Sequence, residues 1–133
     1  MNGKVELSTL LSDMSPLLDD RNWVFVMVDD EAFDHLAPNA IASFREAEGV
    51  TLVLPALGAY DCEYMSGPMA RITLEVHSSL EAVGLTAAVA GALATEGISA
   101  NVIAAYYHDH IFVPEASAEH AMNLLQALSA GSK

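Results

Sequence analysis

The residues with the clearest chemical potential are the triplet His108-Asp109-His110 and the loop at residues 77–84. Histidines two positions apart share a face of an extended strand, as metal ligands must, whereas Asp109 would point to the opposite face. A zinc site needs at least three protein ligands, and the sequence identifies no further one. We therefore expect the triplet to be a polar turn, with no metal and no cofactor.

The loop at 77–84 is the better candidate for binding a ligand. It ends at Gly84, where the backbone can approach a ligand closely because no side chain intervenes. A predicted helix follows, and its first N–H groups and positive dipole end suit the carboxylate of a free amino acid. The alternative, which the residues leave open, is a loop that only joins a strand to a helix.

Nothing in the sequence forms a complete catalytic motif. No Gly-x-Ser-x-Gly, Walker or His-Glu-x-x-His pattern occurs. The single cysteine, Cys62, lies between Asp61 and Glu63, whose charges disfavour a thiolate. We expect no catalytic residues and predict that the protein is not an enzyme. One cysteine also excludes an intrachain disulfide, which fits a reducing compartment.

The second half of the chain, residues 67–133, predicts the elements that would hold this loop. Alternating residues indicate strands, and apolar residues at helical spacing indicate helices. Gly97 should end the first helix and Ser117 should cap the second. The predicted order is strand 71–76, helix 85–96, strand 98–105, turn 106–109, strand 110–113 and a helix after 117.

The first half, residues 1–66, predicts a helix at 7–14, strands at 23–28 and 50–54, and a helix between Pro38 and Gly49. The cluster Asp19-Asp20-Arg21-Asn22 is typical of a turn. Each half lacks one strand of a ferredoxin-like unit, which has the element order βαββαβ. We expect Lys4 to Glu6 to complete one unit as a short strand, and the sheets otherwise to share edges within the chain or across a homo-oligomer, a dimer or tetramer.

The composition limits the partners. The formal charge of −13 comes from 18 acidic against 5 basic residues, and residues 1–66 carry −9 of it. Because nucleic acids and anionic membranes require local positive charge, neither is an expected partner. The N-terminal residues lack the apolar core of a signal peptide, and no apolar run is long enough to cross a membrane. We expect a cytoplasmic protein.

Three motifs in the second half, Gly84, residues 96–102 and residues 107–114, resemble those of an ACT domain, a βαββαβ module that senses amino acids. The last two motifs are similar to those of the aspartate-kinase type and, more closely, of the CASTOR type. The first half, through residues 16–18 and 46–55, resembles small stand-alone proteins with two ACT-like units. This resemblance implies an α+β fold of two ferredoxin-like units, at 1–66 and 67–133, with antiparallel sheets and helices packed on one face.

The resemblance also implies a ligand site, since ACT effectors bind at the loop before the first helix and across to the second strand of a neighbouring unit. The corresponding residues here are Ser78, Ser79, Val83, Gly84, Leu85, Asn101 and Val102. The implied function is a regulatory protein that senses a free amino acid or a related metabolite. The alternative is a structural or interaction module with the same fold and no ligand.

Overall fold

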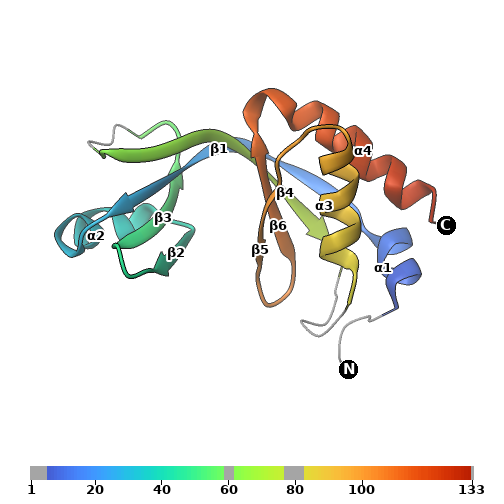
Figure 1. Ribbon diagram of the computed structural model, residues 1–133, viewed down its shortest axis with the longest axis horizontal. Helices are drawn as coiled ribbons and strands as arrows, with labels where there is room; N and C mark the ends of the chain where they lie inside the picture. Colours follow the sequence, from blue (N-terminus) through green and yellow to red (C-terminus); the bar gives the residue numbers. More distant parts are fainter. Residues whose placement is uncertain (1–5, 59–61, 77–82, 133) are drawn as a thin grey trace. The chain divides into compact units, whose positions relative to one another are not determined.

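The computed structural model of the protein describes residues 6–58, 62–76 and 83–132 (Figure 1). Its α-helices are α1 Leu7–Asp13, α2 Asp30–Leu36, α3 Leu85–Thr95 and α4 Ala118–Ala130. Its strands are β1 Ser15–Val28, β2 Ala42–Arg45, β3 Val50–Pro55, β4 Tyr64–Glu75, β5 Asn101–Ala104 and β6 Asp109–Pro114. Two 3₁₀ turns, Ala37–Asn39 and Glu115–Ser117, complete the order, which confirms the expected α+β class.

In the sheet, hydrogen-bonded strands are neighbours in the order β2-β3-β1-β4-β6-β5. Strand β3 pairs antiparallel with β1 and with β2, and β5 pairs antiparallel with β6. The chain divides into two compact units, unit 1 (residues 1–19 and 70–133) and unit 2 (residues 20–69). Both long strands run through this division, so the predicted boundary between residues 66 and 67 falls inside β4.

Unit 1 has the element order that the second half of the sequence predicts, with β4, α3, β5, β6 and α4 in succession. The missing strand comes from the other end of the chain: β1 neighbours β4, and its first part, Ser15–Asp19, belongs to unit 1. The segment Lys4–Glu6 therefore does not have to supply it. Lys4 and Val5 lie outside the described residues, and Glu6 immediately precedes α1.

The core of unit 1 lies between its helices and one face of its strands (Figure 1). Helix α3 contributes Leu85, Val89 and Leu93, which recur at helical spacing and are all less than 5% exposed. Gly97 follows the helix with a left-handed φ of 77°, as its predicted role as terminator requires. Ser129 of α4 donates to the carbonyl of Met14 at 2.9 Å, which ties α4 to the end of α1.

Unit 2 packs α2 against alternate residues of β1 and β3. Val24 pairs with Leu54, and Val28 pairs with Val50, so their side chains share one face of the sheet. Phe33 and Leu36 of α2 pack against this face. The side chains at the intervening positions, Phe25 and Met27 among them, must face away from α2.

Two sequence predictions for the first half are wrong. Residues 19–22 are not a turn but the middle of β1, where neighbouring strands satisfy a backbone that carries turn-forming side chains. The helix expected after Pro38 is absent from the described chain, and Phe44 lies in β2. The helix forms earlier, because Asp29 caps it by accepting a hydrogen bond from the Ala32 N–H at 2.9 Å.

Candidate functional site

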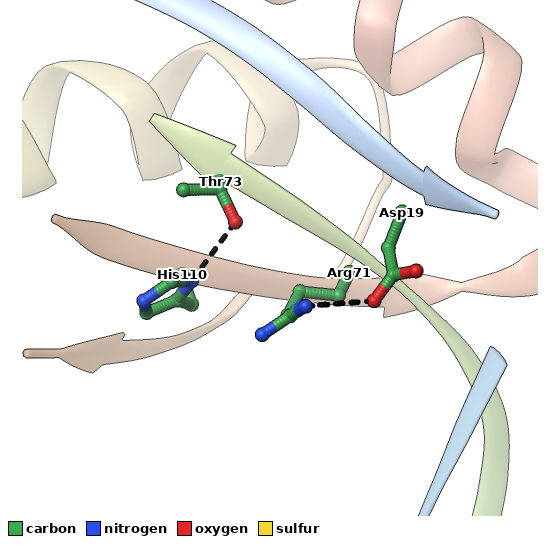
Figure 2. Close-up of polar contacts among 4 residues, drawn as sticks. All are labelled: Asp19, Arg71, Thr73 and His110. Atoms are coloured by element: carbon green, nitrogen blue, oxygen red, sulfur yellow. Dashed lines mark hydrogen bonds and ion pairs between the residues drawn. The ribbon is translucent and has the colours of Figure 1, made fainter. Parts of the chain in front are cut away.

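The face of the unit 1 sheet that points away from the helices carries a polar cluster, formed by Asp19, Arg71, Thr73 and His110 (Figure 2). Alternation explains its position. Ile72 and Leu74 of β4 point into the core, so Arg71 and Thr73 point the other way. The same rule sends Ile111 of β6 to the core and His110 to the cluster.

Asp19 and Arg71 form a partly buried ion pair. The Nε and Nη2 atoms of Arg71 donate to Oδ2 of Asp19 at 3.1 and 2.8 Å. Only 25% of the Arg71 side chain and 11% of the Asp19 side chain are exposed. Two charge-assisted hydrogen bonds to one carboxylate oxygen hold the Arg71 guanidinium in place between the neighbouring strands β1 and β4.

His110 lies on the adjacent strand, with its Nδ1 atom 2.9 Å from the hydroxyl oxygen of Thr73 (Figure 2). Burial lowers the pKa of this imidazole from its usual 6.5, and the charges of Arg71 and His108 lower it further, against the opposing effect of Asp109. A lowered pKa favours the neutral imidazole, whose ring can accept or donate a hydrogen bond according to its tautomer.

The His-Asp-His triplet does not gather on one face. His108 lies in the turn before β6, and its Nδ1 atom is buried without a hydrogen-bond partner among the described residues. Asp109 pairs with Ala104, whereas His110 pairs with Ile103 on the opposite face. Burial raises the pKa of the Asp109 carboxyl. Within the described chain, no group of three or more His, Cys, Asp or Glu residues could hold a metal ion.

The residues of the predicted ligand site fall into three sets. Ser78 and Ser79 lie outside the described residues. Val83 and Gly84 precede α3, and Val83 is 81% exposed. Gly84 has a φ of 99°, which residues with a side chain rarely adopt, so the backbone conformation is sufficient reason for a glycine here; an added Cβ would also lie 3.2 Å from Cδ2 of Leu7.

The side chains of the third set, Leu85, Asn101 and Val102, do not all lie on the same side of the sheet. Leu85 is 4% exposed in the core, and Val102 packs against the same core. Asn101 faces the other way, since it pairs with Phe112, and its Nδ2 atom donates to the Phe112 carbonyl at 3.4 Å. Asn101 is thus on the same sheet face as His110, whereas the side chains of Leu85 and Val102 are occupied by packing.

Sequence reasoning did not single out Asp19, Arg71 or Thr73. One signal was present: the alternation at 71–76 already places Arg71 and Thr73 on the face opposite Ile72. Asp19, the partner of Arg71, is 52 positions away in the sequence, and no local pattern links these two residues.

No helix in the described part of the chain is both long and apolar enough to cross a membrane.

Residues 2–66 and residues 69–127 each match the family profile of the ACT domain. Among curated protein sequences, none is significantly similar to this chain. A crystal structure of a Vibrio cholerae protein of unknown function, described as a possible transport protein, is 48% identical. The similarity covers 92% of this chain and 95% of that one, with a TM-score of 0.79.

Two more distant structures share the fold. The ligand-free regulatory subunit of aspartate kinase from Thermus thermophilus is 12% identical, with a TM-score of 0.67 over 89% of this chain and 97% of that one. A protein from Agrobacterium tumefaciens is 16% identical, with a TM-score of 0.67 over 87% of this chain and 89% of that one.

Proposed function

Because this chain belongs to the ACT-domain family and carries two ACT units, we propose that it is a regulatory protein that binds a free amino acid or a related metabolite. The observation that carries the proposal is the pair of family matches, which together span residues 2–66 and 69–127. The likeness in fold to a regulatory subunit of aspartate kinase supports a regulatory role. Regulation without a catalytic site would act through association with another protein.

The proposed binding site is the start of α3 together with β5 of a neighbouring unit, at Ser78, Ser79, Val83, Gly84, Leu85, Asn101 and Val102. Helix α3 has no side-chain hydrogen bond capping its N-terminus in the described chain, so its first N–H groups suit a carboxylate. Because Leu85 and Val102 pack in the core, these two residues would contact a ligand through their backbone. Asn101 is exposed, so a ligand can reach its amide, whose Nδ2 atom also donates to the Phe112 carbonyl at 3.4 Å.

Thermal unfolding of the protein against each of the twenty amino acids tests the proposal. A ligand present at about 100 times its dissociation constant should add about 2.7 kcal/mol to the free energy of unfolding. Val83→Glu should weaken the response, because its carboxylate would repel that of the ligand. Leu57→Glu, the same change at a residue that is 99% exposed in unit 2, is the matched control. No response to any amino acid by the folded protein would refute amino-acid binding.

The alternative function is an interaction module without a ligand, and one observation favours it. Tyr106 and Tyr107 lie at the tip of the β5–β6 hairpin, 72% and 61% exposed, with their rings 4.9 Å apart in an edge-to-face arrangement. Exposed tyrosines are enriched among the residues that anchor protein interfaces. Loss of partner capture by a Tyr106→Ser, Tyr107→Ser variant, without any amino-acid response in the parent protein, would favour this alternative.

We further propose a cytoplasmic, non-enzymatic homo-oligomer, a dimer or tetramer, with no nucleic-acid or membrane partner. Strands β2 and β5 are at the two ends of the strand order, where backbone groups are available to pair with another chain. Sedimentation equilibrium gives the mass directly, and a monomer at all concentrations would contradict the oligomer.

A further inference from the structure

The second surface with the properties of a binding site lies on unit 2, on the sheet face that points away from α2. Met27 pairs with Thr51, and Phe44 pairs with Thr51 from the other side, so these three side chains form a row across β1, β3 and β2. Phe44 is 72% exposed. Within the described residues of unit 2, α2 is the only α-helix, and it covers the opposite face.

Two hollows of about 480 and 310 Å³ lie beside this row. They share Met27, Glu63 and Tyr64 as lining residues, so both hollows border the Glu63 carboxylate and the Tyr64 phenol ring. The larger is walled mainly by apolar side chains, and we call it the Glu63 groove. Its side-chain walls include Phe25, Met27, Thr51, Glu63, Tyr64 and Met65.

The charge of this surface is of one sign. Residues 20–69 contain nine acidic and two basic residues, a net charge of −7. The lining of the two hollows includes Asp29, Glu48 and Glu63 but no lysine or arginine. Glu48 and Glu63 make no hydrogen bond or ion pair with another residue of the described chain, so their carboxylates face solvent.

The two arginines of unit 2 are placed elsewhere. Arg45 pairs with Asp30 at 3.2 Å and lies 6.0 Å from the ring of Phe33, on the α2 side of the sheet. Arg21 lies 4.6 Å above the ring of Trp23. Neither lines a hollow, so no lysine or arginine among the described lining residues offsets the negative charge beside the apolar walls.

We propose that the Glu63 groove binds a small organic cation, a primary amine joined to an apolar or aromatic body. The apolar walls would bury the body, since thioether and aromatic side chains adapt well to such groups. The ammonium would be attracted by Glu63 and by the face of the Tyr64 ring. This site is independent of the amino-acid site proposed in unit 1.

The same charges disfavour the other occupants of an apolar groove. A second copy of the chain would bring a surface of the same net sign against this one, and the repulsion would oppose burial of the apolar row. An anionic or zwitterionic ligand would place a carboxylate beside Glu63. Only a ligand with net positive charge gains binding energy both from the apolar walls and from the carboxylates beside them.

Methionine-methyl NMR of the full chain tests the proposal directly. The probe is 2-phenylethylamine, and 2-phenylethanol is its uncharged counterpart. The amine should shift the methyl signals of Met27 and Met65 to saturation, while the signal of Met14, buried in unit 1, stays in place. The alcohol should bind at least about threefold more weakly, as expected for loss of an exposed ion pair and a cation–π contact.

Glu63→Gln should weaken amine binding by about three- to tenfold and leave alcohol binding unchanged. Glu31→Gln, at an exposed carboxylate of α2 that lines neither hollow, is the matched control and should bind like the parent protein. Equal affinity for amine and alcohol, or no shift of Met27 and Met65, would overturn the proposal. So would shifts that depend on protein concentration alone, since a second copy would then occupy the groove.

Discussion

Breaking the Asp19–Arg71 ion pair tests whether the polar cluster of unit 1 is held as described. The perturbation is a double-mutant cycle of Asp19→Asn and Arg71→Met. The asparagine keeps the shape of the aspartate without its charge, and the methionine keeps most of the aliphatic stem without the guanidinium. Each single change leaves the partner charged and largely buried, with 25% of Arg71 or 11% of Asp19 exposed.

The magnitude follows from this burial and from the two bonds at 3.1 and 2.8 Å. Hydrogen bonds to charged groups contribute about 1.5–3 kcal/mol, and breaking a fully buried pair costs about 3–5 kcal/mol. We expect a loss of about 2 kcal/mol for Asp19→Asn and about 3 kcal/mol for Arg71→Met, because the Asp19 carboxylate that Arg71→Met leaves behind is the more buried group. The double variant should lose about 3 kcal/mol, a coupling of about 2 kcal/mol.

The assay is urea unfolding with linear extrapolation for the parent, both single variants and the double variant. The matched control is the same cycle on Asp30 and Arg45, which lie 3.2 Å apart and whose side chains are 86% and 68% exposed. Its coupling should stay below about 0.5 kcal/mol. If the Asp19–Arg71 coupling is equally small, the pair contributes no more than a surface contact and the cluster is not preorganised.

Four further substitutions probe single residues through the free energy of unfolding. The pKa of His110 lies below 6.5 in the folded chain, so the neutral imidazole contributes fully to the free energy of unfolding above pH 6.5, and this contribution is lost on acidification. His110→Asn should therefore reduce the fall in the free energy of unfolding between pH 7 and pH 5. An unchanged dependence on pH would contradict this. Gly49→Ala would place a Cβ 2.8 Å from the Val28 carbonyl at a φ of 156°, and should cost about 2 kcal/mol or more. Gly91→Ala, in open space on α3, should instead stabilise by up to about 1 kcal/mol, and the reverse ranking would refute the backbone argument. Ser129→Ala removes the bond from α4 to the end of α1 and should cost about 1 kcal/mol, and no measurable loss would show that water replaces it.

The sequence predicted elements well where one local pattern dominated. The apolar stripe before Gly97 predicted α3 almost to the residue, and the run at 50–54 before Pro55 predicted β3. It failed where two local signals competed. Residues 19–22 have turn-forming side chains but lie in β1. Pro38 favours a helix start in the sequence but belongs to the 3₁₀ turn after α2, so Phe44 lies in β2 and not in a helix.

The ligand site shows the same limit. A glycine before a helix marks the start of α3 from sequence alone, but only packing reveals that Gly84 accommodates Leu7 and that Leu85 is buried. The loop residues Ser78 and Ser79 remain a prediction.

By itself the sequence determined the fold family, the acidic charge and the identity of most helices and strands, because hydrophobic periodicity and the conformational limits of glycine and proline act within a few residues. The tertiary structure alone decided that residues 15–19 belong to the unit formed by the second half, and that Asp19 meets Arg71. It also decided which acidic side chains border an apolar groove. These contacts depend on which strands become neighbours, a choice set by burial and hydrogen bonding across the whole chain.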